Sequence, residues 1–494
     1  MEVRELNDQE LARREKLAKY QELGVDPFGK AYKVTHHVAD IRKICGKKSA
    51  KALEKLNLVV SVAGRIKFLR KMGKASFINI QDKTGSIQGY IGIDVVGKKA
   101  YDVFRLADVG DIVGIKGRVM MTRTGELTIR AEKYTHLTKC LHPLPEKFHG
   151  LTDVEERSRR RYLDLIMNDE ARKVAFARPA IIRSIQRFLD AQDFVEVETS
   201  ILNPILGGAS ARPFVTHHNT LDKDFYLRIA TELNLKRLIV GGMERVYEIG
   251  RMFRNEGMDA SHNPEFTSIE IYQAYTDLYG IGALTEKMIR QAAKDVCGSA
   301  IVNYQDKVID FKKPFKWISM NDLVKEKTGI DFSKITDFEE AKKLADEHEI
   351  HLDKFKNTVG YVMNEFFEEL CQDDLIQPTF VYSYPIEVSP LTKKGKDPRF
   401  TERFELFVNG KELANAYTEL NDPIDQRERF EAQLKAKALG DDEASDMDND
   451  FVEALEYGMA PTGGVGMGVD RLAMLLTNQP QIREVILFPT MRDK

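Results

Sequence analysis

The chain has few cysteines and no long apolar run. Its 494 residues include only 4 cysteines, which are widely spaced and form no Cys-x-x-Cys pair. Neither a zinc site nor a disulfide framework is therefore indicated. No apolar stretch approaches the length that spans a bilayer, and the N-terminus is charged from Glu2 onward, so we expect neither membrane insertion nor secretion. These absences favour a soluble cytoplasmic protein, and a length of 494 residues predicts two to four domains.

Two nucleotide-binding signatures are also missing. The sequence has no Gly-x-Gly-x-x-Gly fingerprint, which leaves a Rossmann-type cofactor site unsupported. Residues 92–99 nearly match a phosphate-binding P-loop, but the segment ends in Lys99 where that loop requires a Ser or Thr to coordinate magnesium. No strong helical pattern follows it. We therefore interpret this segment as a connecting loop.

Charge is distributed unevenly along the chain. Residues 1–140 contain 28 Lys and Arg against 16 Asp and Glu, whereas the remainder has 46 against 61. A basic first third on an acidic body suggests a module that binds a polyanion, joined to a catalytic one. The alternative is a solvated lysine-rich surface.

The basic third divides into helices and short strands. Residues 4–24 and 37–57 are rich in Leu, Ala, Glu and Lys and predict helices. Five β-branched runs broken by glycine follow, at residues 58–65, 75–82, 86–93, 111–120 and 127–131. Five strands of this size suit an OB-fold barrel, which binds oligonucleotides across one face.

The most informative segment is a predicted hairpin. Residues 253–256 read Phe-Arg-Asn-Glu, and after a nine-residue loop residues 266–272 read Phe-Thr-Ser-Ile-Glu-Ile-Tyr. Residues two apart on a strand share a face, so Arg254 and Glu256 point together. One face of the returning strand carries Phe266, Ser268, Glu270 and Tyr272. A guanidinium can hold a carboxylate and a phosphate oxygen in fixed geometry, so the hairpin predicts a substrate site, with an ordinary surface hairpin as the alternative.

A glycine-rich strand near the C-terminus strengthens this prediction. Gly464, Gly466 and Gly468 alternate, so one face of the strand has no side chains and a flat ring could lie against it. Arg471 follows and opens an apolar run that predicts a helix. Together with the hairpin, this strand suggests a site for ATP and an amino acid.

These two motifs resemble motifs 2 and 3 of bacterial class II lysyl-tRNA synthetases, and the resemblance covers nearly the whole chain. Further matches to the lysine branch are residues 207–209, 212–214, 231–233 and 419–422. The resemblance implies lysine, ATP and tRNA(Lys) as substrates, Mg2+ as cofactor and a homodimer, with neither a membrane nor DNA as a partner. It also implies a fold of the α+β class, with an N-terminal OB-fold barrel and a catalytic antiparallel sheet flanked by helices.

The resemblance assigns roles to individual residues. Arg254 and Arg471 would be catalytic. ATP would contact Arg254, Glu256, His262, Asn263, Phe266, Gly468 and Arg471. Lysine would contact Gly208, Glu232, Arg254, Glu270, Tyr272, Asn415 and Glu419. In the barrel, Phe77 would stack on an anticodon base, with Arg70, Gln88 and Glu126 around it; a plain core role for Phe77 is the alternative.

A second hairpin carries the metal prediction. Asn409-Gly410 is a strong two-residue turn signal, and pairing outward from it sets Glu405 diagonal to Glu412 on one face. Two such carboxylates repel unless a cation lies between them, and both match the family's magnesium ligands. Solvated surface acids are the alternative. Strand alternation turns Asn415 away from Glu412, so a β-bulge near Ala414 is needed if both face the site.

The predicted domains are a helical extension at 1–57, the barrel at 58–140, a linker at 141–165 and the catalytic domain at 166–494, with a helical insertion at about 280–375. The chain departs from the family at motif 1, a dimer-interface element, where Asp193 and Ser200 replace a typical glycine and proline. Ser210 likewise stands where alanine is frequent. We expect Ser200→Pro to stabilise the dimer because proline fixes the local turn, and a raised melting temperature would support this.

Three alternatives come from other classes. A class II synthetase for aspartate or asparagine shares both motifs, but three acids in the predicted pocket disfavour an anionic substrate. A paralogue that transfers lysine to protein usually lacks an anticodon domain. A non-catalytic RNA-binding protein is disfavoured because every charged residue of the implied site is present.

Overall fold

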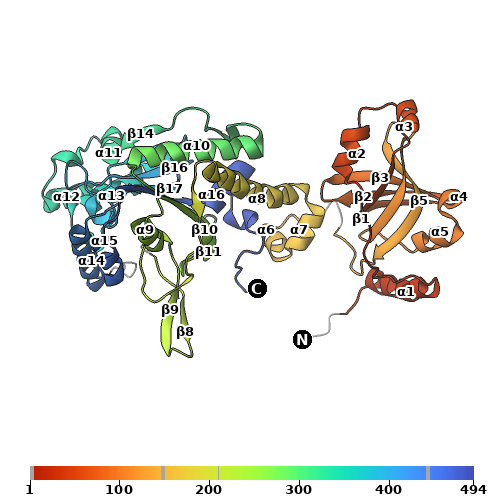
Figure 1. Ribbon diagram of the computed structural model, residues 1–494, viewed down its shortest axis with the longest axis horizontal. Coiled ribbons are helices and arrows are strands. Elements are labelled where there is room, and N and C mark those ends of the chain that lie inside the picture. The colour runs from red at the N-terminus through yellow and green to blue at the C-terminus, as the bar shows by residue number, and fades with distance from the viewer. Residues whose placement is uncertain (1–4, 146–150, 210, 441–445, 494) are drawn as a thin grey trace. The chain divides into compact units, whose positions relative to one another are not determined.

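Figure 1 shows the computed structural model of the chain, which describes residues 5–145, 151–209, 211–440 and 446–493. Ser210 and part of the predicted linker, residues 146–150, lie outside the described residues. The chain divides into two compact units, Met1–Gly150 and Leu151–Lys494. Each unit has its own buried apolar core. Within the described residues, no helix combines the length and the apolar character needed to cross a bilayer.

The first unit is built around a closed five-stranded barrel with the strand order β1-β2-β3-β5-β4. The strands are β1 (Val59–Met72), β2 (Ala75–Asp82), β3 (Gly85–Gly92), β4 (Ile112–Met121) and β5 (Leu127–Thr138). The predicted barrel is confirmed, but β1 and β5 each extend well beyond the expected ends. Register shifts within β1, β4 and β5 bend these long strands, which allows the barrel to close.

Helices surround the barrel. They are α1 (Asp8–Glu22), α2 (Val38–Cys45), α3 (Ala50–Leu56), α4 (Ile93–Val96) and α5 (Lys98–Arg105). The prediction of a connecting loop at residues 92–99 is wrong, because α4 and the first turn of α5 occupy this segment. Tyr101, Val103 and Phe104 of α5 are buried in the barrel core. Packing of these side chains in the core therefore stabilises α5, which is too short to be predicted from hydrophobic periodicity.

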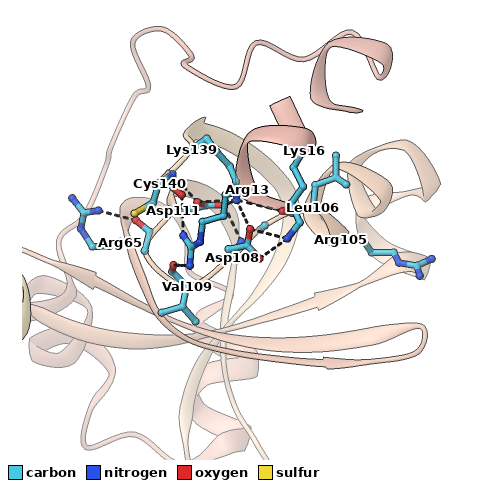
Figure 2. Close-up of polar contacts among 12 residues, drawn as sticks. Arg13, Lys16, Arg65, Arg105, Leu106, Asp108, Val109, Asp111, Lys139 and Cys140 are labelled. Carbon is cyan, nitrogen blue, oxygen red and sulfur yellow. Dashed lines mark hydrogen bonds and ion pairs between the residues drawn. The ribbon is translucent and has the colours of Figure 1, made fainter. Parts of the chain in front are cut away.

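A buried ion cluster attaches α1 to the barrel (Figure 2). The Lys139 ammonium lies 2.6 Å from Asp108 Oδ2 and 2.8 Å from Asp111 Oδ2, and its side chain is fully buried. From α1, Lys16 pairs with Asp108 at 2.6 Å, and Arg13 donates to the carbonyl of Cys140 at 2.8 Å. Because each buried charge has a partner, the cluster can fix the helix against the barrel without leaving a lone ion in the core.

The second unit contains an eight-stranded sheet with the order β14-β15-β16-β17-β18-β11-β10-β6. The strands are β6 (Val195–Glu196), β10 (Arg245–Phe253), β11 (Glu265–Ala274), β14 (Lys316–Ser319), β15 (Thr379–Tyr382), β16 (Arg403–Val408), β17 (Lys411–Thr418) and β18 (Thr462–Gly468). Only the outermost pairs of this sheet, β14 with β15 and β6 with β10, are parallel. The predicted antiparallel sheet is thus confirmed in its centre.

Helices cover one face of this sheet, where α8 and α10 lie along it (Figure 1). The helices of the unit are α6 (Val154–Arg159), α7 (Arg161–Met167), α8 (Asp169–Asp190), α9 (Glu232–Val240), α10 (Leu278–Cys297), α11 (Met320–Thr328), α12 (Phe338–Glu347), α13 (Val359–Leu370), α14 (Pro423–Ala438), α15 (Asn449–Glu456), α16 (Val469–Thr477) and α17 (Ile482–Val485). Apolar residues from α8, α10 and α16 form the main core with the central strands. The helices α8, α10 and α16 do not cover the opposite face of the central strands, so that face can form a binding site.

Two small sheets and a second core complete the unit. The strands are β7 (Leu202–Asn203), β8 (Val215–His218) and β9 (Lys223–Leu227) in one sheet, and β12 (Ile301–Tyr304) and β13 (Lys307–Asp310) in the other. The helices α11 to α13 pack around Phe332, Phe366 and Phe367. Residues 280–375, where an inserted helical region is predicted, contain most of α10, the helices α11 to α13 and the strands β12 to β14.

Candidate active site and nucleic-acid-binding face

A cavity of about 1370 Å³ lies on the uncovered face of the central strands. Residues of β11, β16, β17 and β18 line it, and the loop between β10 and β11 borders it. Such a volume is ample for a nucleotide and an amino acid together.

The β10–β11 hairpin orients its side chains as its alternation predicts. Thr267, Ile269 and Ile271 are buried on the helix-covered side. The opposite face lines the cavity with Phe266, Ser268, Glu270 and Tyr272. Arg254 follows β10, and its guanidinium lies over the ring of Phe266 at 5.3 Å. The buried Nε of Arg254 has no hydrogen-bond partner among the described residues, so this donor can receive an anionic ligand.

The loop of this hairpin meets the helix that follows β18. His262 Nδ1 lies 2.8 Å from Asp259 Oδ2, and His262 Nε2 lies 3.2 Å from Arg471 Nη2. Arg471 also donates to the carbonyl of Glu412 at 2.6 Å. The loop residues Glu256 and Asn263 line the same cavity. The side chains of His262 and Arg471, which can both donate hydrogen bonds, thus lie together at one end of the cavity, where phosphate groups could bind.

The glycines of β18 leave room for neighbouring side chains. In the register of β11 and β18, Gly464 pairs with Tyr272 and Gly466 with Glu270. A Cβ at Gly464 would lie 2.1 Å from Glu419 Oε1, so no larger residue fits there. At Gly466 a Cβ would make an ordinary contact of 3.7 Å with Glu270. Gly468 also lines the cavity.

Three buried glutamates lie together at the other end of the site. Glu232 and Glu270 line the cavity, and Glu419 is fully buried behind Gly464. Glu270 accepts hydrogen bonds from the Thr231 amide at 2.9 Å and from the Tyr272 hydroxyl at 3.1 Å. Burial, with a contribution from the charge of Glu232, raises the pKa of Glu270 to about 7. These acids favour a cationic ligand.

A lysine that the sequence prediction missed lies among these acids. Lys236 is fully buried, and its Nζ lies 2.6 Å from Glu232 Oε1 and 2.5 Å from Glu419 Oε2. Lys236 stands four residues after Glu232 on α9, a spacing that places both on one helix face and could have indicated the first pair. Its pairing with Glu419 depends on the tertiary fold and has no sequence signal.

The second hairpin contains the expected β-bulge. Phe407 pairs with Glu412 and Leu406 with Ala414, which leaves Leu413 as the extra residue on β17. Leu413 and Ala414 are both buried in the core, so Glu412 and Asn415 both line the cavity. The bulge resolves the conflict between strand alternation and the implied position of Asn415.

Arg403 is a second residue that the prediction missed. Its guanidinium donates to Glu405 Oε1 at 2.5 Å, to Asn415 Oδ1 at 3.0 Å and to the carbonyl of Val388 at 2.6 Å. Tyr384 donates to Glu405 Oε2 at 2.9 Å. Burial raises the pKa of Glu405 to about 7, although the charge of Arg403 opposes this rise. Arg403 precedes Glu405 by two residues on β16, so alternation could have placed both on one face.

The carboxylates Glu405 and Glu412 suit a magnesium ion that arrives with phosphate groups. Both line the cavity, and Mg2+ is commonly held by one or two carboxylates plus substrate phosphates and water. The described part of the chain has no group of three or more His, Cys, Asp or Glu side chains placed to hold a metal alone. Two carboxylates are a donor set that a metal–nucleotide complex could use.

The insertion contributes to the cavity, although its sequence shows little obvious chemistry. Asn364, Glu365 and Glu368 of α13 line one wall. Lys356, from the preceding loop, pairs with Glu365 at 2.9 Å. Helix α13 and the loop before it are thus part of the cavity wall.

Motif 1 and the loop after it have two unusual backbone positions. Asp193 adopts a φ of 60°, the left-handed conformation that favours glycine. Gly208 has a φ of +90°, and a Cβ there would lie 3.8 Å from the Cβ of Glu232. Gly208 therefore borders the acid cluster. Ser200 is exposed, and its replacement by proline stays a prediction.

On the barrel, the predicted base-binding residues Arg70, Phe77 and Gln88 lie on the outer face of β1, β2 and β3. Ser76, Ile78 and Ile80 are buried, so Phe77 between them faces outward and is not a core residue. It pairs with Arg70 on β1 and lies 5.4 Å from the ring of Tyr90, which the prediction missed.

The fourth residue of the predicted set, Glu126, is connected to Gln88 through Thr128. The Thr128 hydroxyl lies 2.8 Å from Gln88 Oε1 and 3.1 Å from the carbonyl of Glu126. The Glu126 side chain is exposed. The outer face thus offers stacking and hydrogen-bonding groups side by side.

Comparisons with known proteins give a family match in each of the two units. Residues 153–492 match the family "tRNA synthetases class II (D, K and N)", and residues 60–137 match the family "OB-fold nucleic acid binding domain". The chain is 57% identical to a lysine–tRNA ligase of Streptococcus sanguinis over 491 residues, which cover 99% of each chain. A lysine–tRNA ligase of Streptococcus suis is also 57% identical, and one of Streptococcus agalactiae is 56% identical, each over 99% of both chains.

Proposed function

This chain belongs to the class II lysyl-tRNA synthetases, and we propose that its cavity forms lysyl-adenylate from L-lysine and ATP and then transfers lysine to the 3′-terminal adenosine of tRNA(Lys). The observation that carries the proposal is the charge pattern of the cavity. Buried acids lie at one end, and Arg254 and Arg471 lie at the other. Lysine has two ammonium groups and a carboxylate, and ATP has three phosphates, so this pattern is complementary to both substrates.

The acids account for lysine selection. Glu232 would pair with the α-ammonium, while Glu270, Glu419 and Tyr272 would surround the ε-ammonium, and Gly208 would let the amino acid approach α9. A neutral side chain would leave buried carboxylates without a partner, which strongly disfavours its binding. Ornithine would be rejected less strongly because it keeps both ammonium groups.

Activation requires no side-chain nucleophile. Lysine's carboxylate attacks the α-phosphorus of ATP, and pyrophosphate leaves. Arg254 and Asn415 would hold the attacking carboxylate, and Arg254 would also stabilise the charge that develops on the α-phosphate. The orphan Nε of Arg254 and the cation–π contact that holds its guanidinium over Phe266 support this role. Positioning would supply most of the rate enhancement.

The nucleotide would lie between β11 and β18. Phe266 would stack on adenine against the glycine face, with Glu256, Asn263 and Gly468 around the nucleoside, and Arg471 and His262 would meet the outer phosphates. Glu405 and Glu412 would hold Mg2+. When bound, the ion would neutralise phosphate charge. Arg403 would keep Glu405 and Asn415 oriented toward their ligands, since it donates to both.

The barrel would recognise the anticodon. Phe77 would stack on a base, and Arg70, Gln88 and Glu126 would provide hydrogen bonds beside it. Stacking of this kind contributes about 1–3 kcal/mol per base.

We also propose a cytoplasmic homodimer. Support for the dimer comes from exposed apolar side chains around motif 1 and the small sheet, namely Val195, Ile201, Leu202, Ile205, Val215 and Leu221. Such a concentration is typical of an interaction surface. Sedimentation equilibrium should give twice the chain mass, and a monomer at micromolar concentration would contradict the dimer.

Transfer of radioactive lysine to a tRNA transcript with a UUU anticodon tests the complete function. Acid-precipitable lysyl-tRNA that depends on ATP is the expected result. Charging with aspartate or asparagine instead would favour the nearest alternatives within the class. Binding of tRNA without any charging would favour a non-catalytic RNA-binding protein.

A further inference from the structure

On α9, Lys236 is the one positively charged side chain that is fully buried, and it lies among the pocket acids Glu232, Glu270 and Glu419. Its Nζ bridges Glu232 and Glu419 at 2.6 and 2.5 Å and lies 3.4 Å from the carbonyl of Leu391. Burial alone would lower the pKa of an ammonium, but the charges of Glu232 and Glu419 raise the pKa of Lys236. The ammonium therefore stays charged inside the protein.

The charges of this end of the cavity can be counted. Glu232, Glu270 and Glu419 carry three negative charges when ionised, and Lys236 carries one positive charge. The cluster is then left with two negative charges, which equals the number of ammonium groups on L-lysine. The substrate carboxylate is neutralised separately by Arg254 in the proposed function.

We propose that Lys236 is a positioning residue that sets the pocket's charge to match L-lysine and holds Glu232 and Glu419 in place for it. The inference rests on the proposed function. Without Lys236, Glu232 and Glu419 would be two unpaired carboxylates beside Glu270, and they would repel one another in the empty pocket. This repulsion explains why a pocket for a cation contains a buried cation of its own.

Other charged and titratable groups around the cluster do not replace Lys236. Tyr272 and Tyr417 face the acids from β11 and β17, and burial raises the pKa of both hydroxyls, so they stay neutral. Arg403 on β16 influences Glu232 at longer range but is committed to Glu405 and Asn415. On α15, the neighbour of Lys236 is the uncharged ring of Phe451, at 6.0 Å.

The variant Lys236→Met tests the proposal because it keeps the side-chain length and removes the charge. In ATP–pyrophosphate exchange, we expect the KM for lysine to rise about tenfold or more, while the KM for ATP stays within about twofold. Calorimetry in two buffers of different ionisation enthalpy counts the protons released when lysine binds. The variant should release the same number of protons per lysine as the unchanged protein, since the carboxyl that is protonated in place of Lys236 must keep its proton to leave two negative charges.

The double variant K236M/E419Q removes the ion pair as a unit and restores two negative charges. Its proton release should match the unchanged value, and its KM for lysine should fall below that of K236M. The double variant still leaves Glu232 without its ion-pair partner, but its net charge is restored, so its KM for lysine can be compared with that of the unchanged protein even if K236M fails to fold. Lys327→Met is the matched control, because Lys327 pairs with Asp374 at the surface at 2.6 Å.

The outcomes separate the inference from the proposed function. Release of an extra proton per lysine by K236M, or a parallel rise of both KM values, would overturn the role of Lys236. So would a folded double variant that binds ATP normally but has a KM for lysine no lower than that of K236M. Absence of lysine-dependent exchange in the unchanged protein would instead overturn the proposed function itself.

Discussion

At the scale of single residues, the site depends on positions where only one side-chain size or charge fits. Gly464 is such a position, because its missing Cβ makes room for Glu419 and Tyr272. Arg254 is another, because its buried Nε has no partner within the described residues. In the proposed function, the charge at Arg254 and the space at Gly464 therefore both serve lysine recognition.

Gly464→Ala should damage the lysine pocket. The new Cβ would lie 2.1 Å from Glu419 Oε1 and 2.5 Å from Tyr272 Cε1, so both side chains must move. We expect a loss of about 1–3 kcal/mol in the free energy of unfolding and a raised KM for lysine. Gly466→Ala is the matched stability control on the same face, since its Cβ would make only a 3.7 Å contact. Equal melting temperatures of the two variants would contradict this account of β18.

Lysine binding should strengthen as the pH rises through about 7. Burial raises the pKa of Glu270 from 4.5 to about 7, and that of Glu419 is raised as well, so both carboxyls lose their protons only near or above neutrality. A carboxyl whose pKa is raised in the folded state stabilises the ligand-free protein most below pH 4.5, and this contribution is lost as the pH rises through about 7. Lysine should therefore raise the melting temperature more at pH 8.5 than at pH 6.5. Glu270→Gln should reduce this difference, and an unchanged difference would argue against Glu270.

At the scale of secondary-structure elements, strand alternation predicted much of the site and tertiary packing supplied the rest. The faces of β11 and β18 follow directly from a period of two, and the bulge on β17 follows from the need to turn both Glu412 and Asn415 inward. The ends of β1 and β5 could not be predicted, because barrel closure sets them. The Lys236–Glu419 pair joins elements 183 positions apart in sequence, and no local pattern reports such a contact.

Asp193→Gly should stabilise the turn after α8. Asp193 has a φ of 60°, a backbone conformation that glycine adopts without steric cost. We expect an increase of about 0.5–1 kcal/mol in the free energy of unfolding, measured by urea denaturation. Asp222→Gly, at a φ of 46° in the β8–β9 hairpin, is a comparable substitution outside motif 1. A destabilised D193G protein would mean that the carboxylate makes a contact worth more than the backbone strain.

At the scale of the whole molecule, the proposed function assigns tRNA recognition to the first unit and the chemistry to the second. The basic first unit presents an aromatic outer face on its barrel, and the second unit contains the acidic cavity. Binding of a polyanion by the first unit should weaken with salt, whereas lysine activation should depend on salt much less. Substitutions in one unit should therefore leave the partial reaction of the other intact.

Phe77→Ala tests this division. The variant should raise the KM for tRNA in aminoacylation by roughly 5-fold to 150-fold, which corresponds to the loss of one stacked base. Lysine-dependent ATP–pyrophosphate exchange should not change, because it needs no tRNA. Phe28→Ala removes another exposed aromatic of the same unit, beside Thr138, and should have little effect on either assay. A fall in the exchange rate of F77A would contradict the division of roles.

ATP–pyrophosphate exchange, measured with each of the twenty amino acids in the absence of tRNA, tests lysine activation most directly. We predict exchange with lysine alone, because only lysine would place ammonium groups against both Glu232 and Glu270 while its carboxylate reaches Arg254. Exchange with aspartate or asparagine, or no exchange with any amino acid, would contradict it.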